Sequence, residues 1–104
     1  MSESRRLELH EKLCEMLGSR NVYFQPPETV KLEYPCIIYS RGMDESVYAD
    51  NMNYLVYSCW EIQIIAKDPT FELFDTFTSK WQYVRKKASF AADNLNHANY
   101  TLFY

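Results

Sequence analysis

The stretch YLVYSCWEIQIIA, residues 54–66, constrains the fold of this chain more than any other segment. Apolar and polar side chains alternate along its second half, which is the pattern of a β-strand with one buried face. Trp60, Ile62 and Ile64 fall on one side of that strand, and Glu61 and Gln63 fall on the other. Such a strand needs partner strands and a covering layer, so we expect a sheet whose core lies on one face.

Three further segments are predicted to contribute strands. The apolar run at residues 36–39 follows a proline, which is tolerated at the start of a strand, and we expect it to be covered on both faces. Residues 98–104 are aromatic and β-branched and need an antiparallel partner. We interpret residues 81–90 as that partner, with a continued helix as the alternative for this segment. Residues 22–24 are a possible short strand, ended by the two prolines that follow it.

Two segments are predicted to be helices. Residues 4–17 place apolar side chains at helical spacing, and Gly18 suits the left-handed conformation that ends a helix. Residues 69–80 follow Asp68, a good capping residue, and begin with proline, which is favoured in the first turn. The apolar positions of the first helix are Leu9, Leu13, Met16 and Leu17.

These elements define the expected fold class. We predict one domain over residues 1–104, of the α+β class, in which a mostly antiparallel four-stranded sheet is packed by two helices. The order of elements is roughly α-β-β-α-β-β.

A polar cluster directly before the last strand is the most conspicuous candidate site. It has the residue types of a metal or catalytic site, and Asn99-Tyr100-Thr101 matches a glycosylation acceptor. Asp and Asn also hydrogen-bond their own backbone and tolerate left-handed φ, so they can reverse the chain without glycine. We therefore predict a structural turn in which His97 hydrogen-bonds a neighbouring carbonyl. The cluster consists of Asp93, Asn94, Asn96, His97 and Asn99.

No combination of residues supports a catalytic, metal or cofactor site. His10 and Cys14 stand at i, i+4 on one helix, but no motif supplies the two further ligands that zinc requires. No nucleophile, metalloprotease or phosphate-loop motif occurs, and there are only two glycines. We expect a protein that is not an enzyme and has no cofactor. The three cysteines, an odd number in apolar settings, are expected to be free thiols that alkylation would label.

Charge and apolar content limit the partners. The net charge of −3 argues against a protein that reads nucleic acid, and the apolar runs are too short to span a bilayer. The N-terminus has no signal peptide pattern, so we expect the chain to be cytosolic where it is made. Aromatic residues make up 16% of the chain, more than so small a domain can bury completely, which favours protein contacts.

The order of several short motifs resembles a known family. The motifs are VYFQPPETVKLEYPCIIYSRG, then YADN, then a long strand closing on AKDP, then ADNLNH and a terminal aromatic strand. Over about residues 7–69 and 90–104 this sequence is similar to the small tail completion proteins of long-tailed bacteriophages, also called tail terminator or tail-to-head joining proteins.

The resemblance implies a structural role in the virion. Proteins of this family form a ring, usually of six subunits, on the last ring of the tail tube, and the ring stops tube growth and meets the head-neck connector. DNA passes through the lumen without being read. The resemblance therefore implies assembly in the bacterial host cytoplasm, a final location in the virion tail or neck, and no cofactor or membrane.

The polar connection at residues 43–53 is the candidate interface with a neighbouring subunit or the tail. It is too long for a tight turn, and Tyr48 stands among acids as a possible anchor. A solvated acidic hairpin is the simpler interpretation of the same residues. The interface candidates are Asp44, Glu45, Tyr48, Asp50 and Asn51. The alternative functions are a cytosolic small-ligand or regulatory binding module with an aromatic pocket and, more weakly, a hydrolase with dispersed acids.

Overall fold

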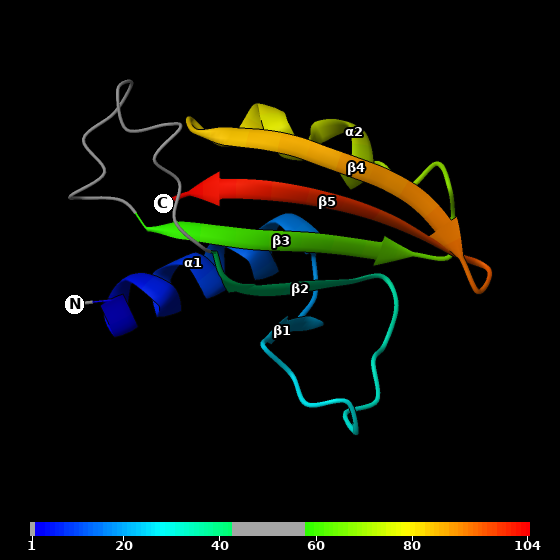
Figure 1. The fold of residues 1–104 in the computed structure, drawn as a ribbon, viewed down its shortest axis with the longest axis horizontal. Helices are drawn as coiled ribbons and strands as arrows, with labels where there is room; N and C mark the ends of the chain where they lie inside the picture. The colour runs from blue at the N-terminus through cyan, green and yellow to red at the C-terminus, as the bar shows by residue number, and fades with distance from the viewer. Residues whose placement is uncertain (1, 43–57) are drawn as a thin grey trace.

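The computed structural model describes residues 2–42 and 58–104 of the chain. Its elements, in chain order, belong to the predicted α+β class (Figure 1). They are helix α1 (Ser2–Leu17), strands β1 (Val22–Phe24), β2 (Cys36–Arg41) and β3 (Cys59–Ala66), helix α2 (Leu73–Thr76), the 3-10 helix η2 (Phe77–Lys80), and strands β4 (Val84–Ala92) and β5 (Leu95–Phe103).

The sheet differs from the predicted one in strand number and direction. Its five strands lie in the order β1-β2-β3-β5-β4, and β1 is parallel to β2 while every other pair is antiparallel. The prediction of four mostly antiparallel strands is therefore wrong, because the short segment at Val22–Phe24 joins the edge of the sheet. Residues 25–35 carry the chain back along the sheet, so that β2 starts in the same direction as β1 (Figure 1).

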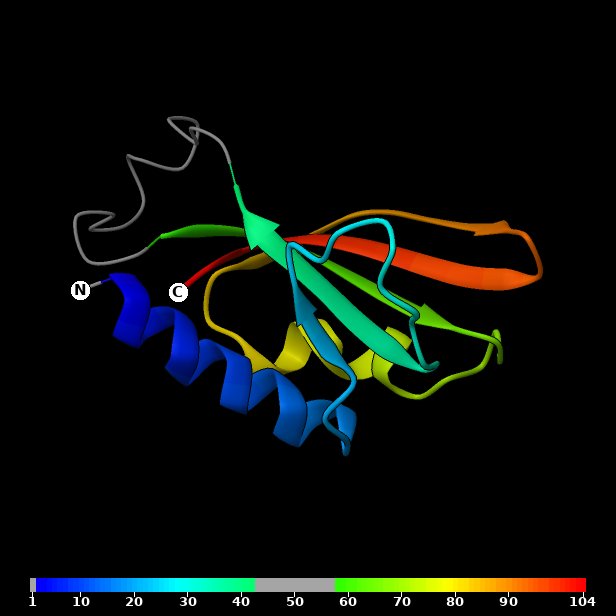
Figure 2. The ribbon, with the colours of Figure 1, turned by 90° about the horizontal axis from the view of Figure 1, so that it is seen from below.

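Both helices lie on one side of the sheet (Figure 2). Trp60, Ile62 and Ile64 of β3 are fully or almost fully buried beneath them, as the alternation of the sequence predicts. Leu9 and Leu13 of α1 are completely buried against this face. Gly18 adopts a φ of 84° after the helix, and its N–H donates to the carbonyl of Cys14 at 2.9 Å, so the predicted end of α1 is confirmed.

The second helix is much shorter than predicted. Helix was expected over residues 69–80, but α2 spans only Leu73–Thr76 before the chain tightens into η2. Asp68 does act as a local cap, since its carboxylate accepts the N–H of Thr70 at 2.9 Å and the Thr70 hydroxyl at 2.7 Å. Several threonines and Ser79 disfavour a regular helix here, and short helices are marginal without packing.

The last two strands form a hairpin that the sequence largely predicts. The ambiguous segment is a strand, but it spans Val84–Ala92 with a bulge between Lys86 and Ala88. The polar cluster builds the reversal, because Asp93 and Asn94 adopt φ values of 55° and 64° without glycine. β5 then begins at Leu95, earlier than the predicted residue 98. Of the long predicted strand, Cys59–Ala66 is confirmed, and residues 54–57 lie outside the described part of the chain.

Two leucines of α1 offer a matched test of this packing. Leu9 is completely buried, whereas 51% of Leu7 is exposed. We expect Leu9→Ala to lower the free energy of unfolding by about 2–5 kcal/mol, because it leaves a cavity in the core. Leu7→Ala is expected to change it by no more than about 0.5 kcal/mol. Urea unfolding followed by circular dichroism measures both; equal effects would contradict the placement of α1.

Candidate functional site

The polar cluster before the last strand is divided between two structural roles. Asp93 and Asn94 make the turn, while Asn96 ties β5 to the end of β3. The Asn96 side-chain amide donates to the carbonyl oxygens of Ala66 and Lys67 at 3.4 and 3.2 Å. The cluster residues therefore do not converge on a common point where a metal or substrate would bind.

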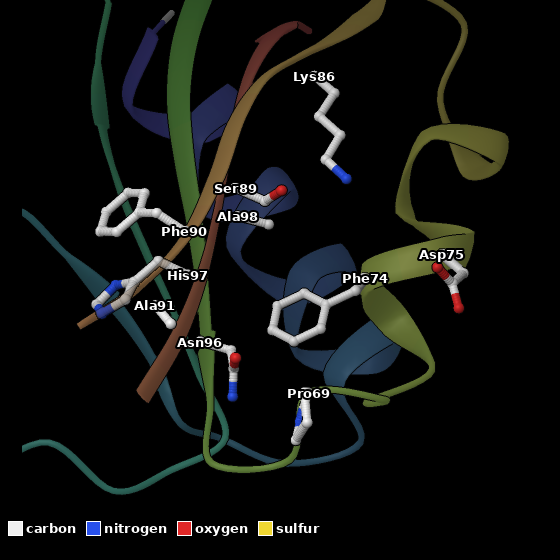
Figure 3. A pocket seen from close by; sticks show the side chains of 10 residues that line it. All are labelled: Pro69, Phe74, Asp75, Lys86, Ser89, Phe90, Ala91, Asn96, His97 and Ala98. Carbon is white, nitrogen blue, oxygen red and sulfur yellow. The ribbon is translucent and has the colours of Figure 1, made fainter. Parts of the chain in front are cut away.

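His97 has a different environment from the one predicted. Its ring stacks on Phe90, with 4.7 Å between ring centroids and 5° between planes. The Nδ1 atom is buried and has no hydrogen-bond partner among the described residues, so the predicted bond from this nitrogen to a neighbouring carbonyl is absent. Both side chains point away from α2 (Figure 3). His97 thus belongs to the sheet face that the helices leave uncovered.

We call that sheet face the outer face and define it by Ile38, Glu61, Gln63, Lys87, Phe90, His97, Asn99 and Thr101. Its centre is a polar network: Glu61 Oε1 accepts the Lys87 ammonium at 3.1 Å and the Thr101 hydroxyl at 3.3 Å. Lys87 lies two positions after Arg85, which pairs with Thr101, and it is the extra residue of the bulge in β4. The sequence places Glu61 outward, but it gives no sign of its partners, which come from two later strands.

The outer face combines apolar exposure with unsatisfied polar groups. Phe90 is 47% exposed although it is aromatic. Next to it along the sheet, the buried Oδ1 of Asn99 accepts no hydrogen bond from any described residue. A hollow of about 350 Å³ lies beside Asn99, bordered by Ile38, Gln63 and Lys87. This combination suits contact with another molecule that supplies donors and apolar surface.

A second hollow, of about 320 Å³, lies on the opposite side, between α2 and the β4–β5 hairpin (Figure 3). The ring of Phe74 projects toward it, and Asp75 and Lys86 stand at its border. The carbonyl of Phe74 accepts a hydrogen bond from the Tyr100 hydroxyl at 3.2 Å. This bond fixes α2 against β5, so the hollow is formed by packed elements.

The predicted pair of zinc ligands is used in packing. The His10 ring nitrogen Nδ1 lies 2.8 Å from the Tyr39 hydroxyl, and Cys14 is buried. Burial, and secondarily the charge of Arg20, lowers the pKa of His10. Cys14, Cys36 and Cys59 are all buried free thiols, as predicted, and burial raises the pKa of Cys36 to about 11. Within residues 2–42 and 58–104, no three His, Cys, Asp or Glu side chains gather as metal ligands would.

The interface candidates from the sequence, Asp44, Glu45, Tyr48, Asp50 and Asn51, all lie outside the described residues. None of the described helices is long and apolar enough to cross a membrane.

Comparison with known proteins identifies no relative: no family model, curated protein or solved structure matches this chain.

The stacked pair on the outer face gives a prediction for His97. We expect His97→Ala to lower the free energy of unfolding by about 0.5–1.5 kcal/mol, because the aromatic stack is lost. In a double-mutant cycle with Phe90→Ala, most of that loss should appear as coupling between the two residues. Protein purified without a histidine tag should contain no stoichiometric zinc by elemental analysis. Zinc that is present in the parent protein and lost in His97→Ala would contradict the structural role.

The burial of His10 predicts a pH dependence of stability. Because the folded state lowers the His10 pKa below its ordinary value of about 6.5, the unfolded chain takes up the proton first as the pH falls. The contribution of His10 is therefore fully present above pH of about 6.5 and is lost as the pH falls toward the folded pKa. In urea titrations at successive pH values from neutral to mildly acidic, His10→Gln should lose less stability than the parent. Parallel curves for the two proteins would contradict this effect.

Proposed function

We propose that this chain is a structural tail completion protein of a bacteriophage or prophage, which ends tail tube growth and joins the tail to the head. The resemblance in the order and spacing of its motifs gives the specific family. In this role the subunit acts by binding other proteins, without catalysis or a cofactor.

The observation that carries the proposal is the composition of the outer face. Among the described residues, both helices cover the other side of the sheet, and this side carries exposed Phe90 and the unpaired acceptor of Asn99. Antiparallel sheets often turn one face to water, but that face is then uniformly polar. An exposed aromatic ring beside a polar atom that lacks a partner is more consistent with a surface that docks against protein.

The proposed assembly has three kinds of contact. Copies of the chain bind one another in a ring, a hexamer as in the family it resembles. One side of the ring meets the tail tube protein, and the other meets the head-neck connector. DNA passes through the central opening without sequence-specific binding, in keeping with the net charge of −3. Electron microscopy of tails made with and without this chain tests the function directly: we expect overlong tubes in its absence, and tubes of normal length would overturn the proposal.

A small-ligand or regulatory binding module is the second candidate. The hollow beside α2 favours it, since the aromatic ring of Phe74 faces a concavity with Asp75 and Lys86 at its border (Figure 3). Its volume of about 320 Å³ is at the lower end of the range for small-molecule sites. A ligand module should remain a monomer or dimer and gain thermal stability with its ligand, whereas a tail protein should assemble on tubes.

Tyr48 provides a direct test of assembly. We expect the parent chain to be mainly monomeric at micromolar concentration by light scattering, and to form rings at high concentration or on tail tubes. If Tyr48 anchors the contact, Tyr48→Ala should weaken it by about 2 kcal/mol. The circular dichroism spectrum should be unchanged, while tubes become uncontrolled in length. Normal capping by Tyr48→Ala would show that the contact lies elsewhere.

A further inference from the structure

A groove of about 460 Å³ lies between α1 and the segment that leads from η2 into β4. Its lining comes from three parts of the chain that are distant in sequence: Arg5, Lys12 and Glu15 from α1, Lys80 at the end of η2 with Trp81 directly after it, and Tyr104 after β5. The groove is separate from the outer face, because α1 packs on the opposite side of the sheet (Figure 2).

The charge of the groove is opposite to that of the whole chain. Three cationic side chains against one carboxylate give its lining a net charge of +2, on a chain whose net charge is −3. Lys12 and Lys80 are exposed and make no ion pair with any described residue. Two unpaired ammonium groups beside a concave surface attract an anionic partner.

Aromatic side chains form the wall of the groove. The rings of Trp81 and Tyr104 meet edge to face at 5.8 Å, and the Arg5 guanidinium lies over the Tyr104 ring at 4.3 Å from its centre. The indole N–H of Trp81 is buried and has no acceptor among the described residues. Buried donors are rarely left unpaired, so this N–H indicates a missing acceptor such as a carboxylate or a peptide carbonyl.

We propose that the groove binds the acidic stretch at residues 44–50 of a second copy of this chain. The sequence of that stretch holds three carboxylates, Asp44, Glu45 and Asp50, around the aromatic Tyr48, which complements a basic groove with an aromatic wall. A closed ring also requires two different surfaces on each copy, one meeting the other. The proposed contact would join neighbouring subunits of the ring, and to this extent it rests on the proposed function.

Peptide binding tests the contact on the full chain without any tail component. A synthetic peptide of residues 43–53 is titrated into the protein by isothermal calorimetry. We expect the double variant Lys12→Glu/Lys80→Glu to bind it at least about tenfold more weakly, because two attractions become repulsions. A peptide with Asn, Gln and Asn in place of Asp44, Glu45 and Asp50 should also bind at least about tenfold more weakly.

The matched control reverses two lysines outside the groove. Lys31 and Lys67 are exposed, so Lys31→Glu/Lys67→Glu changes the net charge equally and should retain the parent affinity within about twofold. Equal weakening by the groove and control variants would show non-specific attraction and overturn the proposal. The proposal would also be overturned if the peptide did not bind the parent protein. This outcome includes the case in which the acidic stretch of each chain occupies the groove of the same chain.

Mixing two variants tests whether the contact forms between copies. A Lys12→Glu/Lys80→Glu chain retains only the acidic stretch, and an Asp44→Lys/Glu45→Lys chain retains only the groove. At a concentration where the parent protein assembles, each variant alone should stay monomeric, and the mixture should form 1:1 dimers that grow no further. A mixture that stays monomeric would overturn the proposal.

The two proposals can fail independently. If peptide and variants behave as expected but tails form normally without the chain, the contact stands and the tail function fails. If the chain is required for tube termination but neither the peptide nor the mixture binds, the function stands and this contact is wrong. Circular dichroism of each variant confirms that it is folded before binding is measured.

Discussion

The pairing of β3 with β5 is the interaction on which the rest of the structure depends. Its register sets Trp60 opposite Leu102 and Ile62 opposite Tyr100, so the apolar sides of two strands form one continuous face. Phe77 packs on that face with its ring 4.6 Å from the Tyr100 ring. If β3 were shifted by one residue relative to β5, every side chain of β3 would move to the other face of the sheet and Glu61 would be buried. The hydrophobic core and the polar network of the outer face therefore follow from the same register.

The parts of the fold that the sequence predicts are those encoded locally. Alternation in β3, helical spacing in α1 and the turn at Asp93 and Asn94 each depend on neighbouring residues, and all three are confirmed. The sequence indicates β1 only as a possible strand, because three residues are too few to show a clear alternation. Its parallel pairing with β2 depends on the path of residues 25–35, which no local pattern predicts. The predicted length of α2 is wrong. A capping residue indicates where a helix can start, but tertiary packing determines how far the helix continues.

The candidate surfaces were less predictable than the fold, because they join residues that are distant in the sequence. Lys87 of β4 reaches Glu61 of β3 across the intervening strand β5, so this contact depends on a strand order that neither residue specifies. Trp81 and Lys12 line one groove although strands β1, β2 and β3 lie between them in the sequence. The only relevant signal was the surplus of aromatic residues, which indicated that some rings would lie at the surface. Phe90, Trp81 and Tyr104 are among these aromatic residues, but the composition does not indicate which rings lie at the surface.

The free edge of β4 limits how copies of this chain can meet. Among the described strands β4 is at the border of the sheet, and an exposed edge is ordinarily a template for adding another strand. Three consecutive basic residues and the bulge beside Lys87 oppose such addition, as charges and bulges do on natural edges. Contact between copies is then expected through side chains on a preformed surface. The segment that leads into β4 supplies Lys80 and Trp81 to such a surface, so the protected edge and the groove adjoin each other. A contact made by exposed charges at the groove would be reversible and sensitive to salt, which suits the proposed role, in which subunits would stay apart until a tail is ready.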